Sequence, residues 1–411
     1  MKDQGRAVAN FRRLWFSSAS ANTADGICLA AAPLLAASIT RDPALVAGIV
    51  VAQRLPWMVF TLFAGALVDR LDRRRVMVGA DATRALALAV LAATLLAGWE
   101  SLPVLYAVFF CLGIAETLND NASLAILPAI VSKHDLERAN GRIFATASVT
   151  NELIGPPLGG ALFALTPFAS FLTGSAAFSS AAGAARAITG EYGPAERRPL
   201  SARSLLREIG EGLRWFWREP VVRAASIWAA AANLGSAATA AVLVLVAQER
   251  LDLSASGFGL LLAAGAVGGV LGGLFTERVI AFTGRGGAIF VSNILAALAF
   301  AGLAVTSEAL VAGAMLALSS AASMIGNVVA AALRQATIPS EYLGRVTSAY
   351  RLVGLGALPV GALVGGLLAR ETGLTAPFWA SAALMLVVAF ALLPVLSNRR
   401  IEALRAREHE L

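Results

Sequence analysis

Twelve apolar segments follow one another along this chain, and each is long enough to cross a lipid bilayer. A spanning helix needs about 20 mainly apolar residues. Hydrophobic residues make up 58% of the chain and charged residues 14%, a balance that a soluble fold cannot bury. We therefore predict an all-α integral membrane protein with twelve transmembrane helices. The segments cover residues 14–39, 44–68, 76–97, 102–127, 140–165, 168–189, 221–247, 257–281, 287–306, 309–333, 343–369 and 375–396.

The connections between these segments differ in their basic residues. Every second connection is rich in arginine or lysine, whereas the opposite connections hold only Arg41, Arg250 and Arg370. Because basic loops stay in the cytoplasm, we expect a multi-pass protein of the cell inner membrane with both termini cytoplasmic. The basic loops on the cytoplasmic side of the lipid membrane account for the net charge of +7, so no nucleic-acid partner is expected.

The two halves of the chain repeat each other. The stretch from Gly65 to Arg70 after the second segment matches Gly273 to Arg278 after the eighth. Two parallel six-helix repeats are the architecture of one large transporter class. We expect two six-helix bundles, a linker with an amphipathic helix on the inner leaflet, and a cytoplasmic tail. The bundles are expected to cover residues 1–189 and 221–397. The linker between them is expected to cover 190–220 and the tail 398–411.

Two motifs resemble the major facilitator superfamily over essentially the whole chain. The loop Gly65-Ala-Leu-Val-Asp69-Arg70-Leu-Asp72-Arg73-Arg-Arg is similar to the family's signature loop. Asp72 stands where the family usually has a second glycine, and this variant resembles the branch of siderophore, macrolide and multidrug exporters. The resemblance implies two pseudo-symmetric six-helix bundles that work by alternating access.

The second motif lies in the fifth segment. The sequence Gly155-Pro-Pro-Leu-Gly159-Gly160 is similar to the motif of drug/proton antiporters, but Asn151 replaces the glycine expected four residues earlier. The arginine that these antiporters often carry in the fourth segment has no convincing equivalent. Pro156 lacks a helix donor and is expected to bend the segment.

The signature loop suggests a cytoplasmic gate. Asp69 ends the second segment, where an acid can face the positive end of another helix, and Arg73 could pair with it. The resemblance implies that this helix is the eleventh. Glu277 and Arg278 occupy the pseudo-symmetric place. The alternative is a solvated run of charges.

Glycines at four-residue spacing indicate close helix packing in lipid. The resemblance implies that segments five and eight are in contact, and likewise segments two and eleven. Glycine faces without side chains at these contacts would allow the two halves to move against each other. Static packing is the alternative. The candidate packing glycines are Gly155, Gly159 and Gly160 in segment five and Gly265, Gly269 and Gly273 in segment eight.

Acids inside the membrane are costly and are functional candidates by default. Asp25, Glu116 and Glu152 fall near the bilayer centre, and Asp120 lies one turn beyond Glu116. Burial favours the protonated form of a carboxylate, so such a group can bind a proton in one conformation and release it in another. The candidate proton-coupling and cavity residues are Asp25, Glu116, Glu152, Asp120, Arg54, Asn119 and Asn151.

A structural alternative applies to Asp25. Arg54 lies at a similar depth in the neighbouring segment, so a buried Asp25–Arg54 pair could hold the helices together. Asp81 and Arg84 are placed nearer the cytoplasmic end, as packing or gate charges. For Glu116 and Glu152 no basic partner is evident.

Together these features predict a monomeric exporter of small amphiphilic compounds, drugs or siderophore-like metabolites, driven by proton antiport. It is expected to need no cofactor or metal, with the proton gradient as its energy source. A lipid or glycolipid flippase, or an importer, is the alternative within the same fold. An intramembrane enzyme or a non-transporting scaffold is disfavoured, because neither an HExxH nor a GxSxG pattern occurs.

Overall fold

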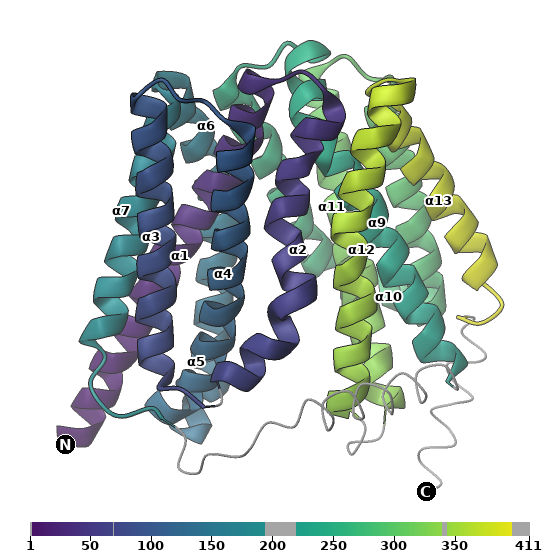
Figure 1. The fold of residues 1–411 in the computed structure, drawn as a ribbon. Helices are drawn as coiled ribbons and strands as arrows, with labels where there is room; N and C mark the ends of the chain where they lie inside the picture. Colours follow the sequence, from purple (N-terminus) through teal and green to yellow (C-terminus); the bar gives the residue numbers. More distant parts are fainter. Residues whose placement is uncertain (1, 69, 194–218, 339–342, 397–411) are drawn as a thin grey trace, which may run out of the picture. The chain divides into compact units, whose positions relative to one another are not determined.

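The computed structural model describes residues 2–68, 70–193, 219–338 and 343–396, and these form helices joined by short connections (Figure 1). The fold-class prediction is confirmed, since each of the twelve predicted segments lies on helix. The elements are α1 (Lys2–Ile39), α2 (Pro43–Val68), α3 (Arg73–Leu96), α4 (Leu102–Ile130), η1 (Lys133–Asp135), α5 (Leu136–Ala147), η2 (Ser148–Ile154), α6 (Gly155–Leu165), α7 (Pro167–Ala187), α9 (Pro220–Glu249), α10 (Ala255–Val305), α11 (Ala309–Thr337), α12 (Leu343–Thr372) and α13 (Ala376–Leu392).

Two predicted segments share α10, and one is divided among three elements. Helix α10 contains the eighth and ninth segments, which are separated at Gly284, where φ is 73° and the helix kinks. Glycine adopts this left-handed conformation without the steric cost of a side chain. The fifth segment consists of α5, the π-helix η2 and α6, so it is interrupted just before Pro156, as expected.

The helices form two compact units. Unit 1 falls within residues 1–41, 52–199 and 252–263, and unit 2 within 42–51, 200–251 and 264–411. Two short pieces, residues 42–51 and 252–263, belong to a different unit from their neighbours in the sequence. The first turns of α2 pack in unit 2 against α9 and α12, where Ala47 shares a core with Ala237 and Ala362. The start of α10 packs in unit 1, where Gly259 adjoins the backbone of Pro156.

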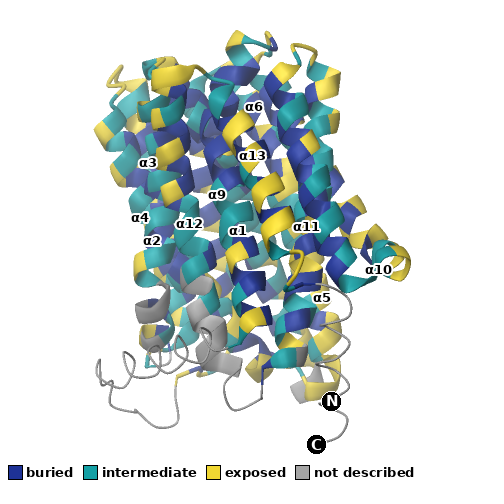
Figure 2. Cartoon of the chain, turned by 90° about the vertical axis from the view of Figure 1, so that its right-hand side faces the viewer, coloured by how far each residue is buried: buried dark blue, intermediate teal, exposed yellow. Residues whose placement is uncertain are grey.

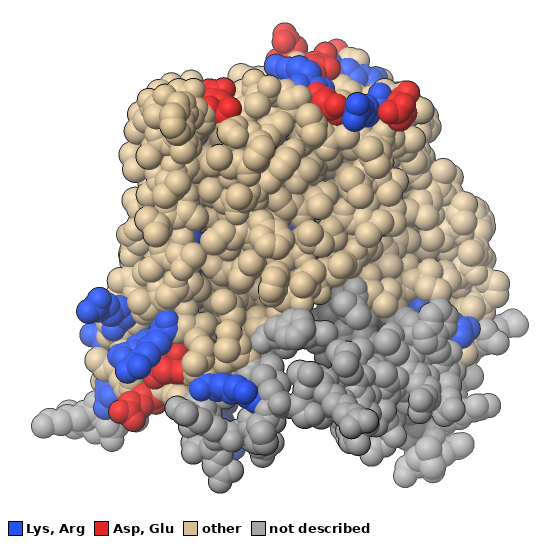
Figure 3. All heavy atoms as spheres, in the orientation of Figure 1, with Lys and Arg blue, Asp and Glu red and all other residues tan. Residues whose placement is uncertain are grey.

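The surface is that of a protein embedded in lipid. Charged side chains gather at the ends of the helices and leave a broad belt almost free of charge (Figure 3). Large apolar side chains are exposed on outer faces, as on α13 (Figure 2), where Val387 is 64% exposed and Phe390 60%. Among the described residues, eight helices are long and apolar enough to cross a membrane. The chain is a multi-pass membrane protein.

Glycines let several helices touch backbone to backbone, but not all the expected ones. Gly155 and Gly159 pack against Gly26 and Ile27 of α1, and Gly160 against Ala255 of α10. The expected stripe Gly265–Gly269–Gly273 is not the tight face of α10. Gly269 has no neighbour within 4 Å, and Gly265 and Gly273 meet only side chains of α11.

The tight face of α10 lies one position away from the expected stripe. A Cβ on Gly268 or Gly272 would meet the backbone of Ala317 or Ala321 in α11. In α12, Gly361 and Gly365 pack against the backbone of α9, while Gly366 meets the start of α2. These glycines therefore hold helices together within the units.

Adjacent positions of α10 supply a matched test of this packing. Gly268→Ala is expected to destabilise the protein by about 1–3 kcal/mol, because the new methyl group overpacks the contact with α11. Gly269→Ala is expected to be neutral or slightly stabilising, since alanine favours a helix over glycine. Thermal unfolding of both purified variants in detergent measures the difference. Equal melting temperatures would contradict the assigned face.

Some predicted features lie outside the described residues. These are the amphipathic linker helix, whose apolar positions were Leu205, Ile209, Leu213 and Phe216, the tail after residue 397, and Asp69 of the signature loop. The Asp69–Arg73 contact and the linker helix therefore stay predictions.

Candidate functional site

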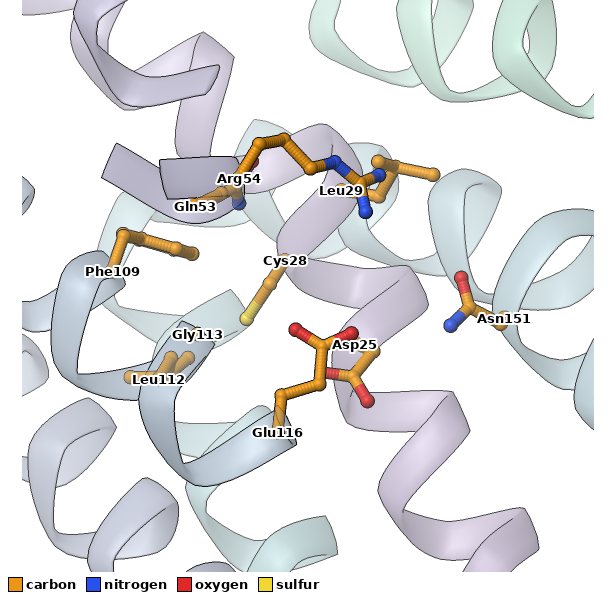
Figure 4. A pocket seen from close by; sticks show the side chains of 10 residues that line it. All are labelled: Asp25, Cys28, Leu29, Gln53, Arg54, Phe109, Leu112, Gly113, Glu116 and Asn151. Carbon is orange, nitrogen blue, oxygen red and sulfur yellow. The ribbon is translucent and has the colours of Figure 1, made fainter. Parts of the chain in front are cut away.

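Unit 1 contains a pocket of about 560 Å³ at the level where α1, α2, α4 and η2 come together (Figure 4). This volume includes open solvent, and the part that can hold water-sized groups is about 100 Å³. The pocket brings together four of the predicted site residues, Asp25, Arg54, Glu116 and Asn151. The complete lining is Asp25, Cys28, Leu29, Gln53, Arg54, Phe109, Leu112, Gly113, Glu116 and Asn151.

Two glycines allow the pocket helices to come close. Gly26 of α1 packs on the backbone of Asn151, and a Cβ on Gly113 of α4 would lie 2.8 Å from the carbonyl oxygen of Gln53 in α2. Larger residues at either position would push α1 from η2 or α4 from α2. These contacts fix the distances across the pocket, and neither glycine was among the predicted packing positions.

The partner of Asp25 is Arg84 of α3. The Arg84 guanidinium makes an ion pair and hydrogen bond with the Asp25 carboxylate and lies 3.4 Å from Oδ1 of Asp81. It also stacks on the Phe178 ring of α7, 3.9 Å from its centroid, a cation–π contact. The proposed Asp25–Arg54 pair is therefore wrong. We call Asp25, Asp81 and Arg84 the buried triad.

The triad lies deeper in unit 1 than the sequence suggested. Arg84 is near the middle of the 24-residue α3, not near its cytoplasmic end, and its side chain is 1% exposed. Asp81 is fully buried as well, and within the described chain its Oδ2 and Nε of Arg84 have no hydrogen-bond partner. Buried polar groups without partners are costly, so the triad is a demanding arrangement for the fold to maintain.

The π-helix η2 decides which side chains of the fifth segment enter the pocket. The N–H of Gly155 donates to the carbonyl of Thr150, five residues back, and Pro156 has no N–H to continue the ordinary pattern. The extra residue turns Asn151 into the pocket, where its amide lies 3.4 Å from Oδ1 of Asn22. Glu152 is exposed and does not line the pocket. Such π-helical turns are frequent at functional sites.

The two other predicted residues of α4 also lie outside the pocket. Asp120 is exposed. Asn119 is buried on another side of the helix, and its Oδ1 has no partner among the described residues. Glu152 and Asp120 therefore do not line the pocket, although Asp120 follows Glu116 by one turn on the same face of α4 and the two charges interact.

The signature loop is held by the end of α7 and the residues that follow it. Asp72 caps α3, with Oδ1 accepting from the N–H of Arg75 at 2.9 Å and Oδ2 from the N–H of Tyr192 at 3.2 Å. Arg74 donates to the carbonyl of Ile188 at 2.9 Å, and the N–H of Arg73 lies 3.4 Å from the carbonyl oxygen of Tyr192. Aspartate in place of the usual glycine therefore joins the loop to residues 188–192.

The remaining gate residues make fewer contacts. Gly65 of α2 approaches Asn121 of α4, and the N–H of Arg70 donates to Leu67. Glu277 is exposed on α10, and Arg278 lies over the ring of Phe275 at 5.3 Å. Within the described chain Glu277 and Arg278 do not form an ion pair.

The cap suggests a direct test of the role of Asp72. We expect Asp72→Ala to lower stability by about 1 kcal/mol, because it removes an N-cap acceptor and the contact with Tyr192. Asp72→Asn keeps one carboxamide oxygen and should lose less. Thermal unfolding of the two variants beside wild type gives the comparison, and an alanine variant as stable as wild type would refute the assigned role.

Unit 2 has a smaller pocket of about 250 Å³ without charged lining residues. Its polar groups include Trp228, whose indole N–H donates to Oδ1 of Asn293 at 3.0 Å, and Ser292 and Ser323. Of these two pockets, the one lined by ionisable residues belongs to unit 1.

Comparison with known protein families gives a match along nearly the entire chain. The model of a major facilitator family described as "Transmembrane secretion effector" matches residues 7–409. The multidrug efflux pump Tap of Mycolicibacterium fortuitum is 28% identical over 386 residues, covering 91% of this chain and 92% of Tap. The enterobactin exporter EntS of Shigella boydii serotype 18 is 25% identical, covering 82% of this chain and 80% of EntS.

Solved structures support the same fold. The nucleoside transporter NupG aligns with a TM-score of 0.72 at 13% identity, covering 94% of this chain and 98% of NupG. A bacterial homologue of the iron transporter ferroportin, in an inward-facing state, aligns with a TM-score of 0.69 at 19% identity, covering 96% and 99%. At these identities the likeness concerns the fold alone.

Proposed function

The chain belongs to the transmembrane secretion effector family of major facilitator transporters and is not an enzyme, and on this premise we propose that it exports small amphiphilic compounds by proton antiport. The observation that carries the proposal is the unit 1 pocket, where the carboxylates of Asp25 and Glu116 line a mainly polar surface together with Leu29, Phe109 and Leu112. The same proposal includes alternating access and a monomeric state. It also includes an inner-membrane location with cytoplasmic termini and the bundle bounds stated above.

The relatives support export rather than import. Tap is named a multidrug efflux pump and EntS an enterobactin exporter, and both align over most of the chain. A lipid or glycolipid flippase would use the same fold. The pocket favours a smaller ligand, because the space in it that can hold water-sized groups, about 100 Å³, is far too small for a lipid with acyl chains.

The two pocket carboxylates suggest how protons could drive export. A ligand shifts a two-state equilibrium only by its different affinity for the two states. Asp25 is held by Arg84, whereas Glu116 forms no ion pair within the described chain. A proton that binds Glu116 in one conformation and leaves it in the other would supply this difference. The signature loop, with Asp69, Arg70 and Arg73, and the Glu277–Arg278 copy are proposed to stabilise one of the two conformations.

Dye flux in proteoliposomes tests the function. The purified chain is reconstituted, a pH gradient is imposed, and movement of a fluorescent amphiphilic cation such as ethidium is followed against protein-free liposomes. We expect transport that increases with the gradient and stops when a protonophore collapses it. Flux that ignores the protonophore would remove the antiport proposal, and the absence of flux for drugs and siderophores alike would remove the exporter proposal.

A further inference from the structure

The pocket in unit 1 carries a positive charge that a purely cation-binding site would not need. Arg54 of α2 lines the pocket together with Asp25 and Glu116. Its side chain is half-buried, and no described residue makes an ion pair or a hydrogen bond with it. Exposed to lipid or left unpaired, a guanidinium is costly, so its place in the pocket wall requires an explanation.

The other charges of the pocket form no ion pair with Arg54 in the described chain, although Glu116 attracts it from across the pocket. Asp25 pairs with Arg84, which approaches it from α3, outside the pocket lining. Asp81 belongs to the same buried triad and does not reach the pocket. Glu116 and Arg54 therefore remain as the two pocket charges without an ion pair in the described chain, one of each sign.

The arrangement separates these charges by apolar groups. In the view of Figure 4 the Arg54 guanidinium lies beside Leu29 at the top, the Glu116 and Asp25 carboxylates lie below, and Cys28 lies between the two levels. Leu29, Phe109 and Leu112 supply apolar lining. A guanidinium presents parallel N–H donors that match a carboxylate or a phenolate, and the carboxylates attract a cationic group.

We propose that this pocket binds amphoteric small molecules, with the cationic group toward Glu116 and Asp25 and an anionic group on Arg54. The inference rests on the proposed function and narrows its substrate class from amphiphilic cations to compounds with both charges on one apolar body. Arg54 is the specificity-determining residue, because it distinguishes an acid from its neutral ester. The Asp25–Arg84 pair keeps the carboxylate end from collapsing onto Arg54.

Equilibrium binding of a matched dye pair tests the proposal without any gradient. Rhodamine B carries a delocalised cation and a carboxylate, and its ethyl ester carries the cation alone. Fluorescence anisotropy with the full-length protein in detergent gives both Kd values. We expect the acid to bind about tenfold tighter than the ester, the size of a charge-assisted hydrogen-bond contribution.

Variants assign that preference to Arg54. Arg54→Gln should bind the ester as wild type does and lose the tenfold preference for the acid, and Arg54→Lys should keep part of it. Arg186→Gln, which changes an exposed arginine of α7, is the control and should keep the full preference. If Arg54→Gln does not fold, the ratio of the ester Kd to the acid Kd in wild type and in Arg54→Lys still decides the question.

Several results would overturn the inference. Equal binding of acid and ester by wild type, binding of neither dye, or an Arg54→Gln variant that weakens both dyes equally would each do so. The last result would make Arg54 a structural residue. Loss of gradient-driven flux with an intact acid preference would instead contradict proton antiport and leave the amphoteric pocket standing.

Discussion

An Arg84→Gln variant is expected to lose most transport activity and to unfold at a clearly lower temperature than wild type. Arg84 is the cation of the buried triad, and glutamine would leave the Asp25 and Asp81 carboxylates without a counter-charge. Removing one partner of a buried ion pair costs about 3–5 kcal/mol. The same change removes the stacking on Phe178. Thermal unfolding in detergent and dye flux in proteoliposomes measure the two effects.

Two further variants test whether the effect belongs to the buried triad. Asp81→Asn leaves a single Arg84–Asp25 pair and should be milder than Arg84→Gln in both measurements. Arg186→Gln removes an exposed arginine from α7 and should behave as wild type, because surface charges contribute little. An Arg84→Gln protein with the wild-type melting temperature would show that the triad does not stabilise unit 1.

The membrane fold could be predicted from the sequence because lipid imposes few options. Every spanning segment must satisfy its own backbone hydrogen bonds, so hydropathy and length locate the helices directly. All twelve segments were found on this basis. The kink at Gly284, which lets α10 contain two segments, falls where the apolar pattern breaks.

Side-chain partners could not be predicted in the same way. Counting residues gives the depth of a group along a helix but not the direction of its side chain. On depth alone Arg54 was the candidate to neutralise Asp25, whereas in the structure Arg84 takes this place from α3, which packs against α4 and α7. Arg84 was not considered as a partner of Asp25, because the middle of α3 was placed too near the cytoplasm.

The glycine stripes show a similar limit. In α10, Gly265, Gly269 and Gly273 repeat every four residues, and so do Gly268 and Gly272. The pattern indicates close packing but fits either face of the helix. In the structure Gly268 and Gly272 make the backbone contacts with α11.

The fifth segment adds a change of register. Sequence spacing assumes an α-helix throughout, which gives Asn151 and Glu152 comparable claims to the cavity. The π-helix over Ser148–Ile154 alters the rotation at this point, so that Asn151 lines the pocket and Glu152 does not. The Gly-Pro-Pro sequence signals an irregularity, but it does not say which side chain is turned inward.

Replacing Glu116 is expected to uncouple transport from the proton gradient. Asp25 is occupied by Arg84, so Glu116 is the pocket carboxylate that is available to bind a proton. For one proton per substrate, a gradient of one pH unit supplies about 1.4 kcal/mol, which corresponds to about a tenfold accumulation ratio. Wild type should approach that ratio, whereas Glu116→Gln should give a ratio near one, measured at a dye concentration at which the variant still binds the dye.

The matched control is Glu152→Gln, which changes an exposed acid outside the pocket. We expect this variant to keep gradient-driven accumulation close to that of wild type. Both ratios come from the same preparation of liposomes, read with the gradient imposed and again after a protonophore has collapsed it. If Glu152→Gln loses coupling and Glu116→Gln keeps it, the proton is carried outside this pocket, and the pocket is a substrate site alone.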